Sequence, residues 1–183
     1  MRLVSIAAER RPQNPLSLPA KGVVMENDKI SDPHWLSIAL DEFALHIAED
    51  PGPANNPRIL EYIESTGLNP ANDEIPWCAS FVTWCMRQAG YGRPTGPGLH
   101  PARARSWLEW GVPLDQPKRG CVTVLSRGDN PQQGHVGFYL GRGAGPQIIV
   151  LGGNQHDCVC EASFPGRQVL GYRWPREAVD AQR

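Results

Sequence analysis

A cysteine in the segment Pro76-Trp77-Cys78-Ala79-Ser80-Phe81-Val82 is the clearest candidate for chemistry in this chain. The segment is typical of a helix start, which places Cys78 in the first turn. Backbone N–H groups without an intrahelical partner and the positive end of the helix dipole favour a thiolate there. Cysteines in such positions can have pKa values well below the free thiol value of roughly 8.5, and we expect Cys78 to be a nucleophile.

Two later motifs supply partners for this thiol. His135 is the best candidate base, because it begins a predicted strand and neighbouring glycines let other groups approach closely. The next strand ends in Gly152-Gly153-Asn154-Gln155. The amide oxygen of Asn154 can accept a hydrogen bond from an imidazole N–H, and so hold the ring in the orientation that takes a thiol proton.

The chemistry predicted by this set is amide hydrolysis. Cysteine attack on a carbonyl gives an acyl-enzyme, which water resolves with the same histidine as base. Negative charge on the tetrahedral oxygen needs preorganised donors, and the backbone N–H of Cys78 is a candidate. Cys78, His135 and Asn154 follow one another in the order that papain-like enzymes use.

Helices come first and strands second among the elements that must position these residues. Apolar spacing and cap residues predict helical segments at residues 33–50, 57–66, 77–89 and 102–110. Short β-prone runs predict strands at residues 121–125, 135–140, 147–151 and 168–174. We therefore expect an α+β fold in which the Cys78 helix packs on one antiparallel sheet.

Length and composition fit one catalytic domain with an extension. Residues 1–30 mix prolines and charges without a sustained period, so we expect an N-terminal extension or tether there and a catalytic domain over residues 31–183.

The 18 basic and 19 acidic side chains leave a formal net charge of -1. This gives no electrostatic reason to expect nucleic acid or a membrane surface as a partner. We also expect no membrane insertion, because no apolar run approaches the roughly 20 residues of a span.

Metal and cofactor chemistry is not indicated. The five cysteines lack the paired spacings of a zinc site. Acyl transfer at a cysteine requires neither a metal nor an organic group. We therefore predict no metal and no cofactor.

Taken together, the motifs resemble those of the CHAP and NlpC-type cysteine peptidases, closest to a small phage and bacterial branch of that superfamily. In chain order the matching motifs are DEIPWCA (73–79), FV (81–82), ARSW (104–107), GHVG (134–137), GGNQ (152–155) and GYR (171–173). The resemblance covers roughly residues 33–175. It implies a papain-like α+β fold with N-terminal helices packed on a C-terminal antiparallel β-sheet.

The resemblance also implies a substrate and roles. The substrate would be an amide bond in the peptide part of peptidoglycan, cut by an endopeptidase or N-acetylmuramoyl-L-alanine amidase. Cys78 would be the nucleophile, His135 the base and Asn154 the orienting residue. Many CHAP enzymes have an acidic residue in the third position, so the choice between Asn154 and an acidic residue stays open here.

Four residues close to these motifs are candidates for substrate binding. Trp77 adjoins the nucleophile and is our candidate platform for sugar or peptide. Asp73 and Glu74 are candidates to bind a cationic or amide group, although solvated charges near a helix start are an equal alternative. Gln155 completes the set, because it closes the motif that contains Asn154.

The expected partner is peptidoglycan. The N-terminal apolar stretch is too short for a secretory signal. We therefore expect a protein made in the cytoplasm that acts at the cell wall, in the periplasm, as a phage lysis enzyme or as an antibacterial effector delivered by a secretion machine. A delivered toxin would require an immunity protein.

Two alternative functions stay open. One is a cysteine protease or deamidase with a protein substrate. The other is a catalytically silent wall-binding domain, which the presence of all three candidate catalytic groups disfavours.

Overall fold

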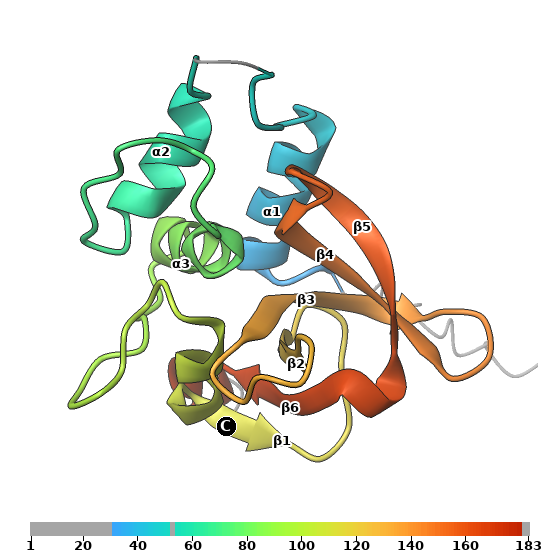
Figure 1. The fold of residues 1–183 in the computed structure, drawn as a ribbon. Coiled ribbons are helices and arrows are strands. Elements are labelled where there is room, and N and C mark those ends of the chain that lie inside the picture. The colour runs from blue at the N-terminus through green and yellow to red at the C-terminus, as the bar shows by residue number, and fades with distance from the viewer. Residues whose placement is uncertain (1–30, 52–53, 181–183) are drawn as a thin grey trace, which may run out of the picture. The chain divides into compact units, whose positions relative to one another are not determined.

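The computed structural model describes residues 31–51 and 54–180. The predicted extension, residues 1–30, lies outside this part of the chain. Helices and a six-stranded sheet make up the described residues (Figure 1). The helices are α1 (His34–Ala44), α2 (Pro57–Glu64), α3 (Cys78–Gln88) and α4 (Arg176–Asp180), with 3-10 helices η1 (Ala104–Glu109) and η2 (Gly166–Gln168).

All neighbouring strands in the sheet pair antiparallel. The strands are β1 (Val112–Leu114), β2 (Val122–Ser126), β3 (Gly134–Arg142), β4 (Gln147–Gln155), β5 (Cys158–Pro165) and β6 (Val169–Trp174). Their order is β1-β6-β2-β3-β4-β5, so β6 returns to lie between β1 and β2. Helices that precede an antiparallel sheet confirm the predicted α+β class.

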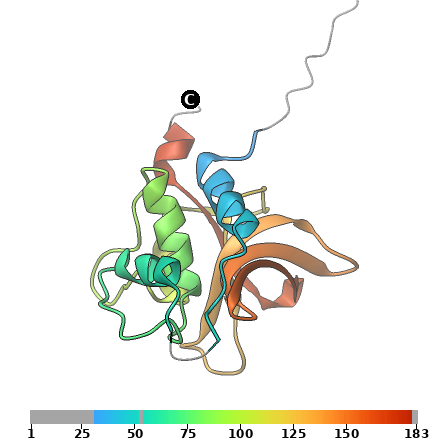
Figure 2. The same ribbon diagram turned by 90° about the horizontal axis from the view of Figure 1, so that it is seen from above.

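Helix α3 packs between the sheet and the other N-terminal helices. Figures 1 and 2 show α1 and α2 beside α3, with β3 and β4 on its other side. The ring of Phe81 on α3 lies 5.4 Å from that of Tyr62 on α2 and 6.2 Å from that of Phe138 on β3, both edge-on. Such aromatic contacts hold α3 against both layers and fix the position of its first residue, Cys78.

Local signals in the sequence explain the ends of the helices. Asn56 accepts a hydrogen bond from the backbone N–H of Arg58, and Pro57 occupies the first position of α2, as predicted. Helix α3 ends before Gly90, whose φ of 83° suits glycine. None of the helices within the described ranges has the length and apolar character needed to cross a bilayer.

Four elements differ from the prediction. Helix α1 ends at Ala44 because His46 adopts a φ of 54°, after which the carbonyl of Ile47 accepts from the N–H of Val159. The sequence also missed β1, which contains a proline, and β5, whose small and polar side chains give no apolar alternation. Strand β4 continues through Gln155, four residues beyond its predicted end.

Candidate active site

Cys78 is the first residue of α3, as predicted, and its side chain is almost completely buried. The preceding residue, Trp77, makes no side-chain cap bond to the first backbone N–H groups of α3. The thiol receives hydrogen bonding from the backbone of Ala79 and of Val136 on β3. Because Val136 directly follows His135, the packing of α3 on β3 brings the nucleophile to the candidate base.

Burial dominates the electrostatics of the thiol. The pKa of Cys78 is raised above its ordinary value, since removal from water disfavours the thiolate. Backbone hydrogen bonds and the charge of Arg127 act in the opposite direction but are smaller. The position at a helix start therefore does not give Cys78 a lowered pKa in the free protein, because desolvation has the larger effect.

His135 is the second residue of β3 and lies opposite Leu125 of β2. Its side chain is buried, and its Nε2 atom lies 2.9 Å from Oε1 of Gln155. Burial lowers the pKa of His135 to about 4; the Gln155 contact raises this pKa and the charge of Arg127 lowers it. At neutral pH the imidazole is therefore uncharged and able to accept a proton.

The side-chain amide of Gln155 determines which nitrogen of His135 carries the proton. Its Nε2 group donates to the backbone oxygens of Val150, at 3.3 Å, and Cys160. Both amide hydrogens are thus engaged, which leaves Oε1 to face the imidazole as an acceptor. His135 must donate from Nε2, so its Nδ1 atom holds the free lone pair that a general base needs.

Several neighbours fix this pair of side chains. The thiols of Cys158 and Cys160 both donate to the backbone oxygen of Gln155, at 3.0 and 2.9 Å. The ring of Phe164 stacks on that of His135, with centroids 5.4 Å apart and an interplanar angle of 27°. Gly152 leaves the necessary space, because a Cβ there would lie 2.9 Å from the Gln155 oxygen and 3.2 Å from the His135 nitrogen.

Asn154 makes a different contact from the one predicted. Its side-chain amide donates to Oε1 of Glu49 at 2.9 Å, while the hydrogen bond to His135 comes from Gln155. The same Glu49 oxygen accepts from the indole N–H of Trp77 at 2.8 Å. Glu49 therefore ties the end of β4 to the residue before the nucleophile. The predicted contact between Asn154 and His135 is wrong because the side chains of Asn154 and Gln155 project to different partners.

Three of the four predicted substrate-binding residues, Trp77, Asp73 and Gln155, are buried. Trp77 is fully buried, so its ring has no surface for a sugar or peptide, and its packing explains Gly153, where a Cβ would lie 2.3 Å from Cζ3 of the indole. Asp73 is also buried, and its carboxylate accepts from the backbone N–H of Asn56 at 2.8 Å. Glu74 is exposed but lines neither cavity at the site.

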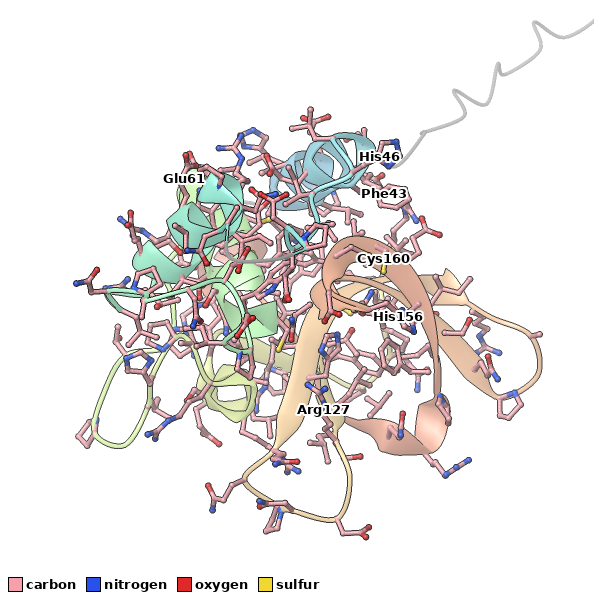
Figure 3. All side chains as sticks on the ribbon, turned by 45° about the horizontal axis from the view of Figure 1, so that its top comes forward. Phe43, His46, Glu61, Arg127, His156 and Cys160 are labelled. Atoms are coloured by element: carbon pink, nitrogen blue, oxygen red, sulfur yellow. The ribbon has the colours of Figure 1, made fainter. Side chains whose placement is uncertain are left out.

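Two cavities flank the nucleophile and base. One, of about 430 Å³, contains Cys78 and is lined by Arg103, Arg127 and Gln132, among others. The other, of about 400 Å³, contains His135. Arg127 lines both cavities, and Figure 3 shows it beneath the β4–β5 hairpin. Sequence reasoning missed this residue, although it directly follows the strand that pairs with the His135 strand.

The part of the chain that the structure describes contains no group of three or more His, Cys, Asp and Glu side chains that could hold a metal ion. All five cysteines are free thiols. The arrangement of Cys78, His135 and Gln155 instead fits nucleophilic attack by a thiol, with an oriented imidazole as base.

Comparison with known proteins agrees with this chemistry. The model of the CHAP domain family matches residues 70–154, from the loop before α3 almost to the end of β4. A search of curated proteins found no match for the chain. The matched range includes Cys78, His135 and Asn154, and Gln155 follows it directly. This match is consistent with a CHAP-type member of the papain-like cysteine peptidase superfamily, a family whose domains are commonly cysteine-dependent hydrolases.

Proposed function

We propose that this protein is a peptidoglycan hydrolase that cleaves an amide bond in the peptide part of the wall through a cysteine acyl-enzyme. The CHAP domain supports an amidase or peptidase with peptidoglycan as substrate class. The observation that carries the proposed catalytic roles is the hydrogen bond between His135 and Gln155, which leaves Nδ1 of the base free. The backbone of the next residue, Val136, contacts the Cys78 thiol. We assign the orienting role to Gln155 instead of Asn154.

The first half of the reaction transfers the acyl group to the enzyme. As the Cys78 sulfur attacks the carbonyl carbon, Nδ1 of His135 takes the thiol proton. Negative charge that develops on the carbonyl oxygen meets the backbone N–H groups at the start of α3, including that of Cys78. The imidazolium then gives its proton to the departing amine nitrogen, and a thioester remains on Cys78.

The second half releases the acyl group. Nδ1 of His135 takes a proton from water, whose oxygen attacks the thioester carbon. The C–S bond breaks, the thiolate regains the proton from His135, and a carboxylic acid leaves. Burial favours the neutral forms of both Cys78 and His135 in the free protein, so we propose that proton transfer accompanies attack on the carbonyl.

The bond cut and the biological setting are part of the proposal. We propose cleavage of either a stem-peptide or cross-bridge bond or the amide between glycan and peptide. The protein would act at the wall after phage lysis or delivery by a secretion machine. In the second setting, a pull-down from producing cells should recover an immunity protein.

The test uses purified protein and isolated peptidoglycan from several wall types. Wild-type protein should release soluble fragments, and Cys78→Ala should release none. Mass spectrometry and labelling of new ends then name the bond. Both activities create new amino termini, but an amidase frees the amine of L-alanine and leaves glycan strands without peptide, whereas an endopeptidase frees the amine of another residue of the stem or cross-bridge. Cys85→Ala is the matched control, because Cys85 lies on the same helix but is buried in the core.

A negative result would be equally clear. If wild-type protein and Cys78→Ala give the same fragments from every wall type, the wall is not the substrate. Cys78-dependent cleavage or deamidation of a protein would then support the alternative of a protein-directed cysteine hydrolase.

A further inference from the structure

Arginine side chains give the cleft around Cys78 its electrostatic character. The cavity that contains Cys78 is lined by Arg103 and Arg127, together with the amides of Gln132 and Gln133. The cavity on the other side contains Arg127, His135 and His156. Neither cavity is lined by an Asp or Glu side chain.

The guanidinium groups of these two arginines differ from those of other arginines in the residues that the structure describes. Within the described residues, ion pairs link Arg58 to Glu42 and Glu61, and Arg119 to Asp32. Other arginines donate to backbone oxygens, as Arg105 does to Gln133 at 2.8 Å. In the same part of the chain, the guanidinium groups of Arg103 and Arg127 make neither kind of contact, so their donors are open to a ligand.

The position of Arg127 ties it to the reaction. It follows Ser126, the last residue of β2, which lies opposite Gly134 in the register with β3. Arg127 is therefore two residues beyond Leu125, the residue opposite His135, and it lines both cavities. A peptide bound across Cys78 would have to pass this guanidinium group.

We propose that Arg127, assisted by Arg103, binds a free carboxylate of the substrate next to the scissile amide, and so selects acidic stem peptides over amidated ones. A guanidinium group presents donors in a planar fork that matches both oxygens of a carboxylate. A carboxamide at the same place lacks the charge and one acceptor. This inference rests on the proposed function and adds the chemical class of substrate to it.

The test compares two muropeptides that differ only in whether the carboxyl groups of the stem are free or amidated. Wild-type protein should show a kcat/KM at least tenfold higher for the free acid, through a lower KM. Arg127→Gln should bring the ratio of the two kcat/KM values close to one. Arg127→Lys should retain part of the preference, because it keeps the charge without the fork.

Arg142→Gln is the matched control. Arg142 is an exposed arginine at the opposite end of the strand that carries His135, and it lines neither cavity. Its substitution should leave the preference as in the wild type. Added salt should raise the KM of the acidic substrate more than that of the amidated one.

The outcomes separate this inference from the proposed function. Equal, Cys78-dependent cleavage of both muropeptides by the wild type would overturn the carboxylate subsite alone. A preference that survives in Arg127→Gln would overturn the role of Arg127. If the wild type cleaves neither muropeptide and no peptidoglycan, the proposed function fails and the subsite fails with it.

Discussion

His135 and Gln155 are joined by a hydrogen bond of 2.9 Å between Nε2 of the imidazole and Oε1 of the amide. Since the amide hydrogens of Gln155 are engaged by two backbone oxygens, this contact fixes the tautomer of the base as well as its direction. The residue that orients His135 in the candidate site is thus Gln155, a neutral amide that directly follows Asn154 in the chain.

The first prediction compares these two neighbours. Gln155→Ala should reduce kcat roughly 10- to 100-fold, a range typical of lost orienting contacts. It should also reduce the free energy of unfolding by about 1–3 kcal/mol, because a buried imidazole N–H loses its acceptor. Asn154→Ala should leave kcat within a few-fold, since its amide contacts Glu49. Kinetics on a soluble muropeptide and thermal unfolding measure both effects.

The opposite ranking would refute the assignment. If Asn154→Ala lost more of kcat than Gln155→Ala while it unfolded at the wild-type temperature, Asn154 would be the orienting residue. Glu49→Gln serves as a control, because it keeps an acceptor oxygen for Asn154 and Trp77 without the charge.

The sequence predicted the class of the fold and the places of Cys78 and His135 in it, at the start of α3 and on β3. Cap residues, glycines and apolar spacing are local signals, which is why the start of α3 and the strand of His135 came out correctly. The choice between Asn154 and Gln155 depends on how far β4 continues and on which face each side chain projects. That is decided by pairing with β5, which the sequence did not reveal.

The sequence also could not predict which side chains near the nucleophile are buried. A tryptophan next to a nucleophile is compatible with a platform or with a core position, and only the packing of Gly153 against Trp77 decides in favour of the core. In the same way, a cysteine at a helix start has a lowered pKa only while water reaches it. At Cys78, desolvation is the larger effect.

The second prediction concerns two adjacent glycines. Gly152→Ala should lower kcat at least tenfold, because its methyl group would press on the Gln155 oxygen and the His135 nitrogen. Gly153→Ala should chiefly reduce stability, by about 1–3 kcal/mol or more, because its methyl group would overlap Trp77 and Phe81. Activity assays and chemical denaturation of both variants test whether Gly152→Ala chiefly affects activity and Gly153→Ala chiefly affects stability. The prediction is wrong if Gly153→Ala is as stable as the wild type.

The third prediction is the pH dependence of kcat/KM. Protonated His135 cannot act as base, so activity should fall at acidic pH along a limb centred near the pKa of about 4. The positive charge of Arg127 disfavours the imidazolium, so Arg127→Gln should raise this pKa and move the limb to higher pH. An amidated substrate avoids titration of substrate carboxylates in the same range.

Arg142→Gln is again the control variant for the pH profile. It removes the same charge from a position remote from His135, so the acidic limb of its kcat/KM profile should coincide with that of the wild type. A limb near the ordinary imidazole value of about 6.5 in the wild-type protein, or a limb that stays in place in Arg127→Gln, would contradict the electrostatic account.

The fourth prediction concerns stability, and its sign follows from the same lowered pKa. Between about pH 6.5 and pH 4 the unfolded chain protonates its histidine while folded His135 stays neutral. The unfolded state then binds more protons, so the free energy of unfolding should fall as the pH drops through this window and level off below it. A shift from 6.5 to about 4 corresponds to roughly 3 kcal/mol.

Urea denaturation at a series of pH values measures this contribution. His135→Gln removes the titrating group and should flatten the curve between pH 6.5 and 4 by that amount, whereas His34→Gln, at the exposed start of α1, should leave the slope in place. If His135→Gln keeps the wild-type slope, His135 is protonated in the folded protein as easily as in the unfolded chain. The neutral imidazole required by the proposed mechanism would then lose its physical basis, because burial would not be holding the base uncharged.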